Sequence, residues 1–338
     1  HGAKIVASAR HQIFVSPTYA YHLIKSLVIR PMWPLNSAFD FGTIIEFPLK
    51  PRPAASRSGK RDLAGLPRVL GRFGQFEIRL AATKKDVRKA QRLRYKVFYE
   101  EGGAAAQAAT ALVRRDLCPF DRYCDHLLVY DMDNRNSFGR SKPKLVGTYR
   151  LLRRSVAEKH GGFYSASEFD IAPLLGRHKD MNFLELGRSC VHAKYRTKRV
   201  IELLWRGLWI YAKHHHVDAL IGCASLPGTN PLALALPLSF LHHQASANDT
   251  WQVTPLKGRA VAMGILEANA VDARKGVAAL PPLVKAYLRV GAKFGNGAVI
   301  DAQFGTVDVF TIMLIAEIED RYIAHFGSAE DVKERAAA

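Results

Sequence analysis

An apolar stretch that carries one acidic and one basic residue constrains the fold of this chain more than any other feature. It runs from residue 183 to residue 191 with the sequence Phe-Leu-Glu-Leu-Gly-Arg-Ser-Cys-Val. Its apolar residues are typical of a buried strand, so the charges of Glu185 and Arg188 need a reason to be there. Because these residues are three positions apart, their side chains lie on opposite faces of a regular strand unless a bulge intervenes.

A basic turn and a helical pattern follow directly. Apolar residues recur at helical spacing from Ile201 to Tyr211, which predicts a helix that begins just after the turn. A turn between a strand and a helix directs free backbone N–H groups and the positive end of the helix dipole beyond the strand, where a phosphate is stabilised. The residues that we expect to bind such a phosphate are Lys194, Arg196, Thr197, Lys198 and Arg199.

The length and the net charge of the chain limit the classes of protein to which it can belong. With 338 residues the chain can bury a substantial core, and its net charge of +19 favours anionic partners such as nucleic acid, an anionic membrane leaflet or an acidic protein. Its four cysteines lack a ligand-like C-x-x-C pairing, which favours a reduced, cytoplasmic setting. No apolar run approaches the roughly 18 residues of a membrane-spanning helix, so we expect a globular protein that does not cross a bilayer.

Composition divides the chain into three parts. Residues 1–74 form a basic N-terminal extension and linker, and segment 50–61 within it is rich in Pro, Gly and Ser. The aromatic, aliphatic and basic segment 14–35 is compatible with a short helix on a membrane surface, with a helix packed on the main domain, or with disorder. We expect a folded domain over residues 75–326 and a C-terminal tail over residues 327–338.

The expected domain mixes strand and helix patterns without an internal repeat, which predicts an α/β (α+β) fold. Alternating apolar residues predict a strand at 76–80, and Thr83 followed by Asp86 predicts the N-terminus of a helix. Strands at 126–131 and 144–152 form a predicted hairpin. Further predicted elements are a strand at 219–223, a helix ending near 242–243, and mixed elements at 251–254, 280–289, 298–302 and 307–315.

Histidine clusters at 214–216 and 242–243 raise the possibility of a metal site. Adjacent side chains do not converge on one ion, and both clusters fall at the ends of predicted helices, where cationic groups suit the dipole. We therefore predict no metal. The chain has no Gly-x-Gly-x-x-Gly, Walker or Gly-x-Ser-x-Gly sequence, which disfavours a covalent hydrolase, and it has no recognisable nucleic-acid module.

Several stretches in chain order carry a resemblance to a known family. They look like the ordered landmarks of acyl-ACP-dependent members of the GNAT acyltransferase superfamily, which acyl-homoserine-lactone synthases share. Residues 75–326 are more similar still to the ornithine-acyl-ACP N-acyltransferases of bacterial ornithine-lipid synthesis. The main stretches are Arg94–Glu100, Phe120–Val129, Val146–Leu152 and Glu185–Val191, with further matches at 203–207, 222–231, 280–292 and 301–310.

The resemblance implies a GNAT fold, in which a strongly twisted, mostly antiparallel sheet is splayed near its centre and holds the acyl-pantetheine arm. The donor would be acyl carrier protein (ACP) carrying a 4′-phosphopantetheine thioester, with no permanently bound cofactor. The turn at 195–199 lacks the glycines of the common acetyltransferase signature, which argues against free acetyl-CoA. The implied product is lyso-ornithine lipid, formed when a long, 3-hydroxylated acyl group is transferred to the α-amine of ornithine.

Within this reaction we assign roles to particular residues. Glu185 is the expected catalytic base or positioning group, because a carboxylate beside the thioester can reach the amine directly or through water. The arginines are expected to bind the substrate carboxylate or to pair with an acidic neighbour. The expected substrate-binding residues are Arg94, Phe98, Asp121, Arg150, Arg188 and Asp308.

Two alternatives remain open from the sequence alone. One is acyl-homoserine-lactone synthesis or another GNAT N-acyltransfer reaction. The other is a non-enzyme, a basic protein that binds a membrane surface or nucleic acid. The preferred partners are ACP, ornithine and an anionic membrane surface, with no nucleic acid, and the expected location is cytoplasmic and peripheral at the inner face of the membrane.

Overall fold

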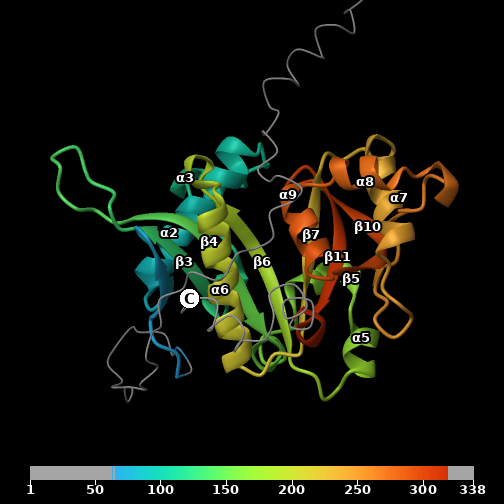
Figure 1. Ribbon diagram of the computed structural model, residues 1–338, viewed down its shortest axis with the longest axis horizontal. Coiled ribbons are helices and arrows are strands. Elements are labelled where there is room, and N and C mark those ends of the chain that lie inside the picture. The colour runs from blue at the N-terminus through green and yellow to red at the C-terminus, as the bar shows by residue number, and fades with distance from the viewer. Residues whose placement is uncertain (1–62, 64, 319–338) are drawn as a thin grey trace, which may run out of the picture.

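The computed structural model describes residues 63 and 65–318, which form a large central sheet flanked by helices (Figure 1). The sheet has nine strands in the order β1-β2-β3-β4-β6-β7-β11-β10-β9. All neighbouring strands are antiparallel except β6 and β7, which are parallel. The strands are β1 (Val69–Phe73), β2 (Phe76–Leu80), β3 (Asp125–Asp131), β4 (Lys144–Arg153), β6 (Phe183–Val191), β7 (Ala219–Pro227), β9 (Ala260–Val261), β10 (Lys293–Asp301) and β11 (Thr306–Leu314).

Two helices cover opposite faces of the first half of the sheet, α2 (Lys84–Tyr95) on one face and α6 (Lys198–His214) on the other. The second half carries shorter helices and a two-stranded sheet of β5 (Phe169–Asp170) and β8 (Thr254–Pro255). The remaining helices are α3 (Ala108–Val113), α4 (Arg154–Ala157), α5 (Ala172–Arg177), α7 (Ala235–Gln244), α8 (Ala273–Ala279) and α9 (Pro282–Arg289).

The expected N-cap of α2 is confirmed. The Thr83 hydroxyl accepts a hydrogen bond from the backbone N–H of Asp86 at 3.1 Å, which satisfies one of the free donors at the start of the helix. Val87 and Ala90 then pack against the face of β3 that carries Leu128 and Tyr130. On the opposite face, Leu127 and Val129 pack in the cluster that includes the apolar residues of α6.

The sheet splays where β6 meets β7. Their parallel pairing covers only Phe183–Glu185 against Ala219–Ile221, although both strands continue well beyond it. A side chain at Gly222 would collide with the carbonyl oxygen of Leu186, so glycine permits the close approach of the two strands at the point where their pairing ends. Past this point each strand presents backbone groups that the other does not use, as expected for a strand pair that binds an extended ligand.

A bulge in β6 brings the side chains of Glu185 and Arg188 to the same side of the sheet, although the two residues are three positions apart. The register between β4 and β6 shifts between Thr148 and Arg150, and Arg188 adopts a left-handed backbone conformation with φ of 53°. The bulge rotates the strand locally, so that Glu185 and Arg188 both contact the same segment, residues 164–165.

Most predicted strands and helices are present, with two differences. Lys198 and Arg199 lie in the first turn of α6, with Thr197 as its N-cap, and not in the preceding turn as we expected, because the helix begins before the apolar pattern does. The expected boundary at residue 75 falls after the first strand, since β1 begins at Val69 and Leu70 is buried in the core. Both histidine clusters lie at helix C-termini, as expected.

The predictions for segments 14–35 and 50–61, and for the tail at 327–338, lie outside the described residues. Among the helices at residues 63 and 65–318, none combines the length and the apolar character that crossing a membrane requires.

Candidate active site

A buried ion-pair cluster lies on the α2 face of the sheet. The Arg94 side chain, on α2, is 1% exposed, and its Nε donates to Asp116 Oδ2 at 2.8 Å while its Nη1 donates to Asp121 Oδ1 at 2.9 Å. Of the two roles expected for the arginines, Arg94 therefore takes the pairing with an acidic neighbour. Both carboxylates belong to the loop that follows α3, so this guanidinium fixes that loop against the sheet.

Two further arginines join the cluster from neighbouring strands. Arg150 on β4 places its Nη1 3.7 Å from Asp121 Oδ1. Arg188 on β6 places its Nε 3.3 Å from Asp116 Oδ2 and donates from Nη2 to the Tyr164 hydroxyl at 3.3 Å. The side chain of Arg188 is 14% exposed, against 1% for Arg94 and 3% for Arg150. Arg188 is thus the guanidinium of the three that can meet a substrate.

The cluster keeps its groups ionised. Burial alone would raise the pKa of Asp121, but the charges of Arg94, His126 and Arg150 outweigh burial and hold that pKa below its usual range. Burial likewise opposes the charge of Arg188, yet Tyr164 and Asp116 raise its pKa above that of a free guanidinium. Asp121 is therefore negatively charged and Arg188 positively charged at neutral pH.

Glu185 is buried on β6 and has a complete set of donors. Its Oε1 accepts from the backbone N–H and the hydroxyl of Ser165 at 2.7 and 2.5 Å, and its Oε2 accepts from the backbone N–H of Tyr164 at 2.8 Å. Burial raises its pKa, and these hydrogen bonds act in the opposite direction. The carboxylate holds the single turn at Tyr164–Ser167 in place, and the Tyr164 ring lies under the Arg188 guanidinium at 4.8 Å.

Phe98 reaches the site through a second aromatic ring. It lies on a π-helical segment (Lys96–Glu101) that continues α2, and its ring meets Phe304 edge-on at 5.8 Å. The Arg188 guanidinium lies 4.7 Å from the centroid of the same Phe304 ring. Single π-helical turns occur frequently at functional sites. Phe98 therefore lines the apolar side of the cluster and makes no polar contact with it.

A second acidic group faces the cluster from the other half of the sheet. Asp308 on β11 is buried and accepts from the Thr306 hydroxyl at 2.7 Å. Its ligand atoms and those of Glu168 and Cys223 all lie within 4.8 Å of one another. Burial raises the pKa of the Cys223 thiol well above its usual value, so the thiol is protonated in the structure described.

The predicted phosphate-binding residues lie beyond the splay at the start of α6. Arg196 donates to Glu101 at 3.0 Å, the Lys198 ammonium lies 3.5 Å from Glu202, and Arg199 lies over the Phe73 ring at 5.6 Å. Lys194 and Thr197 are exposed. Basic residues in the first turn oppose the helix dipole, so an anionic ligand at this end would relieve an unfavourable arrangement.

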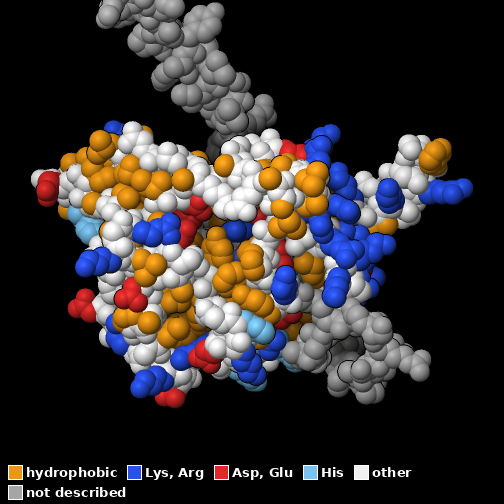
Figure 2. Space-filling model, turned by 180° about the vertical axis from the view of Figure 1, so that it is seen from behind, with side chains coloured by type: hydrophobic (Ala, Val, Ile, Leu, Met, Phe, Trp, Pro, Cys, Tyr) orange, Lys and Arg blue, Asp and Glu red, His pale blue; other side chains and the backbone are white. Residues whose placement is uncertain are grey.

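A larger basic surface runs along the exposed side of α2. Figure 2 shows Lys and Arg side chains gathered over this helix, beside the projecting loop between β3 and β4. At the end of this surface, Lys96 lies 3.1 Å from His192, just before the basic turn. We call this surface the α2 basic face; its exposed members are Lys84, Lys85, Arg88, Arg92 and Lys96.

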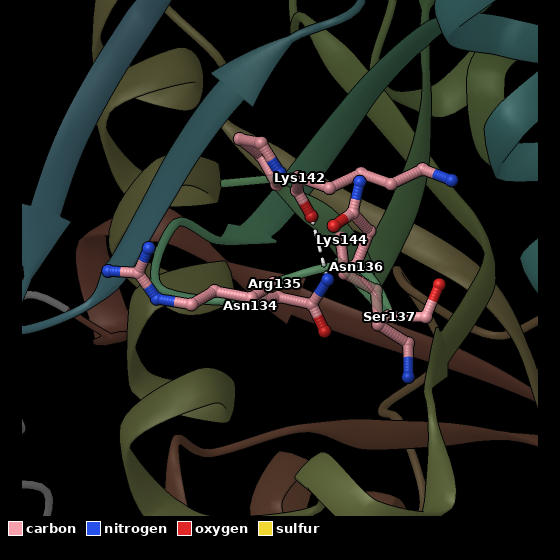
Figure 3. Close-up of a pocket in the computed structure, with 7 residues that line it drawn as sticks. Asn134, Arg135, Asn136, Ser137, Lys142 and Lys144 are labelled. Atoms are coloured by element: carbon pink, nitrogen blue, oxygen red, sulfur yellow. Dashed lines mark hydrogen bonds between the residues drawn. The ribbon is translucent and has the colours of Figure 1, made fainter. Parts of the chain in front are cut away.

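The projecting loop itself holds a depression, shown in Figure 3. Asn134 donates from its side chain to the carbonyl oxygen of Lys142 at 2.7 Å, which closes the loop. The depression is formed by residues 134–137 and 142–144 alone, whose side chains are polar or basic apart from one proline. It shares no residue with the ion-pair cluster, so we do not assign it to the chemistry.

Three residues of the site were absent from the sequence-based prediction: Asp116, Tyr164 and Glu168. Each lies on a loop or single turn, where no periodicity marks it, and each meets the site only through tertiary packing. The sequence did carry a signal for two of them, because Tyr164 and Glu168 flank a short polar segment inside an aromatic and apolar patch.

The fold and the site together define a GNAT-type acyltransferase. The family model described as "Acetyltransferase (GNAT) domain" matches residues 93–206, the segment that contains Arg94, Asp121, Arg150, Glu185 and Arg188. This match, together with the enzymes to which the chain is similar along most of its length, shows that the alternative of a non-enzymatic binding protein is wrong.

Comparison with curated proteins narrows the class to one family. The chain is 48% identical over 259 residues to an L-ornithine N(alpha)-acyltransferase of Agrobacterium fabrum, covering 77% of this chain and 87% of that protein. It is 47% identical to the proteins of the same name in Brucella abortus and Rhizobium meliloti, covering 92% and 87% of their lengths and 77% of this chain in each case. The chain belongs to the L-ornithine N(alpha)-acyltransferase family.

Among solved structures, the N-acyl amino acid synthase FeeM from uncultured soil microbes aligns with a TM-score of 0.37 at 11% identity, over 73% of this chain and 94% of that one. This similarity is too weak to bear on function.

Proposed function

We propose that this enzyme transfers an acyl group from acyl-ACP to the α-amine of ornithine and so forms lyso-ornithine lipid. The observation that carries the proposal is the identity of 47–48% to proteins named for N(alpha)-acylation of ornithine, over most of their length.

The geometry of the site supports this reaction. The gap between β6 and β7 leaves backbone donors and acceptors for the amides of a pantetheine arm, and Arg188 offers a guanidinium at its edge to a substrate carboxylate. The thioester is already activated, so the enzyme mainly has to align the two reactants, and no covalent enzyme intermediate is needed.

The α-amine is the cheaper of the two nucleophiles of ornithine. An α-amine with a pKa near 8 costs about 1.4 kcal/mol to deprotonate at pH 7, whereas a lysine-like amine near 10.4 costs about 4 to 5 kcal/mol. A site that binds the carboxylate at Arg188 also brings the adjacent α-amine, rather than the distant δ-amine, toward the splay.

In this proposal Glu185 positions the site, and the other predicted residues surround the substrate. Glu185 fixes the turn that carries Tyr164, and Tyr164 in turn holds Arg188. Arg94, Asp121 and Arg150 set the position of the cluster, Phe98 shapes its apolar side, and Asp308 lies across the gap.

The basic surfaces suit the proposed donor and the fate of the product. Acyl carrier proteins are strongly acidic, so the α2 basic face and the turn at 194–199 would speed encounter with one. The product is a membrane lipid, and the same positive field would hold the enzyme at the inner, anionic leaflet, where the product can leave.

Expression in a bacterial host that lacks ornithine lipids tests the proposal. We expect mass spectrometry of the extracted lipids to detect lyso-ornithine lipid in cells with the intact chain and none in cells with the vector alone. The absence of any acylated ornithine, with the protein present in the soluble or membrane fraction, would contradict it.

A further inference from the structure

Among the buried carboxylates of the site, Glu168 has the longest hydrogen bond and the longest ion pair. The residue is 5% exposed and lies at the C-terminal end of the turn that Glu185 holds. Its Oε2 accepts from the Cys223 thiol at 3.5 Å, and its Oε1 lies 4.0 Å from the half-exposed Arg259. Asp121, by contrast, pairs with a buried arginine, and Glu185 has three close donors.

The groups around Glu168 are mostly acidic or neutral. Asp308 from β11 and Asp301 from β10 add negative charge on one side, while Cys223 of β7 and Tyr164 of its own turn contribute neutral groups. The positive charge of Arg259 opposes these carboxylates and lowers the pKa of Glu168. A buried carboxylate beside a second carboxylate attracts a cation or holds a proton, and an amino acid substrate brings an ammonium group.

The position of Glu168 matches the expected place of the reaction. Cys223, which it contacts, directly follows Gly222, where β7 parts from β6. Burial and the charges of Glu168, Asp308 and Glu185 together raise the pKa of the Cys223 thiol, so all three carboxylates lie near the start of the gap. The positive charge of Arg188, on the other strand of the gap, lowers the pKa of Asp308.

We propose that Glu168 is the catalytic base that takes a proton from the attacking amine, and that Asp308 beside it sets its basicity. This inference rests on the proposed function. The substrate ammonium gives one proton to Glu168, and the nitrogen lone pair attacks the thioester carbonyl carbon to form the C–N bond. Collapse of the tetrahedral intermediate breaks the C–S bond. The nitrogen loses its second proton as the sulfur leaves as a thiol, and the proton on Glu168 passes to solvent.

The electrostatics agree with this role. Burial, together with the charges of Asp308 and Asp301, raises the pKa of Glu168 to about 7. A general base works best when its pKa lies near the operating pH, because it is then both deprotonated and basic enough to accept a proton. The carboxyl pKa is raised, so the active, ionised form is lost as the pH falls below about 7.

The test is the pH dependence of kcat/KM of the full-length chain with acyl-ACP and ornithine, for four variants beside the wild type. We expect the wild-type value to rise with pH through an apparent pKa near 7, which gives the pH profile an ascending limb.

Glu168→Gln should lower kcat by about 100-fold or more and remove this ascending limb. Asp308→Asn should move the limb to lower pH, and Arg259→Gln should move it to higher pH, because each removes one of the opposing charges. Glu267→Gln, an exposed control, should change neither rate nor profile.

A wild-type limb that persists in folded Glu168→Gln, or limbs that stay in place in both Asp308→Asn and Arg259→Gln, would overturn the inference. These outcomes leave the proposed function intact, since the wild type still acylates ornithine. A wild type that acylates no ornithine would overturn the proposed function itself. Far-ultraviolet circular dichroism and a thermal melt of each variant separate loss of chemistry from loss of fold.

Discussion

At the scale of single residues, the active site is organised by how completely each buried charge is neutralised. Asp116 and Asp121 share Arg94, and Glu185 is satisfied by one short turn. Such paired groups hold Arg188 in position through Asp116 and Tyr164. Glu168 is the exception, and residues of this kind often mark sites of function.

The weak neutralisation of Glu168 has a consequence for stability. Its pKa is raised from 4.5 to about 7, so the ionised form is disfavoured in the folded protein by up to about 3 kcal/mol. This penalty is absent below pH 4.5 or so and complete above about pH 7. We therefore expect Glu168→Gln to be more stable than the wild type at pH 8, and this difference to be much smaller at pH 5, as urea denaturation at both values would show. A variant that is less stable at pH 8 would contradict this electrostatic account.

The exposed edge of Arg188 predicts its effect on substrate binding. Arg188→Lys keeps the charge but loses the planar fork, so we expect the KM for ornithine to rise about tenfold or more, in line with the ~1.5–3 kcal/mol of a hydrogen bond between charged groups. The KM for acyl-ACP should stay unchanged. Arg177→Lys, remote from the cluster and bonded only to backbone carbonyls in the described structure, is the matched control. Equal changes in both KM values would assign Arg188 to the scaffold.

At the scale of elements, the sequence best predicted the strands and helices in which polar or charged residues interrupt or flank a regular apolar pattern. The strand that carries Glu185 and Arg188, the N-cap at Thr83 and the helix from Ile201 onward were all predictable from spacing. The sequence showed that a bulge would be needed to bring Glu185 and Arg188 to the same side, but it did not predict the bulge. Local sequence does not reveal where a strand has one residue more than its partner. Asp121 was predicted only through the family resemblance, and Asp116, Tyr164 and Glu168 were not predicted, because their places in the site depend on tertiary packing.

In our proposal Glu185 is a positioning residue, because its carboxylate accepts the hydrogen bonds that fix the turn at Tyr164–Ser167. Glu185→Gln retains one acceptor oxygen but places an amide N–H₂ against a donor, so the turn should shift and carry Tyr164 and Glu168 with it. We expect the fold to survive and kcat to fall by about 100-fold. The limb near pH 7 should persist in kcat/KM, because Glu168 is still present. Near-normal turnover in a folded Glu185→Gln variant would show that the turn does not depend on this carboxylate.

If acyl-ACP is the donor, as we propose, the α2 basic face is where we expect it to bind. Arg196 and Lys198 already have acidic neighbours, whereas Arg88 and Arg92 are exposed on α2. We expect Arg88→Glu with Arg92→Glu to raise the KM for acyl-ACP more than Arg196→Glu with Lys198→Glu does. Both losses should shrink at high salt, because the Debye length falls from about 10 Å at 0.1 M to about 3 Å at 1 M.

Charge reversal at Arg274 and Lys275, which are exposed on α8, is the control and should leave the KM for acyl-ACP unchanged. If the α8 pair had the same effect as the α2 pair, overall charge rather than a defined docking face would govern the encounter.

At the scale of the whole molecule, the splay at the centre of the sheet lies between charged groups that its two halves contribute. The first half, with α2 and α6, contributes the arginine cluster and the basic face, while the second half contributes Asp308 on β11 (Figure 1). In our proposal a zwitterionic amino acid binds between them, with its carboxylate toward Arg188 and its ammonium toward Glu168 and Asp308. The overall class of fold was predictable from the order of strands and helices, whereas the way the two halves face each other was not.

The most direct measurement of the central claim is the product of the purified chain supplied with 3-hydroxyacyl-ACP and an equimolar mixture of ornithine and S-adenosylmethionine. We predict a single acylated product, which fragmentation in the mass spectrometer identifies as ornithine with the acyl group on its α-nitrogen. An acyl-homoserine lactone, ornithine acylated on its δ-nitrogen, or release of the free acid without an amide would contradict it.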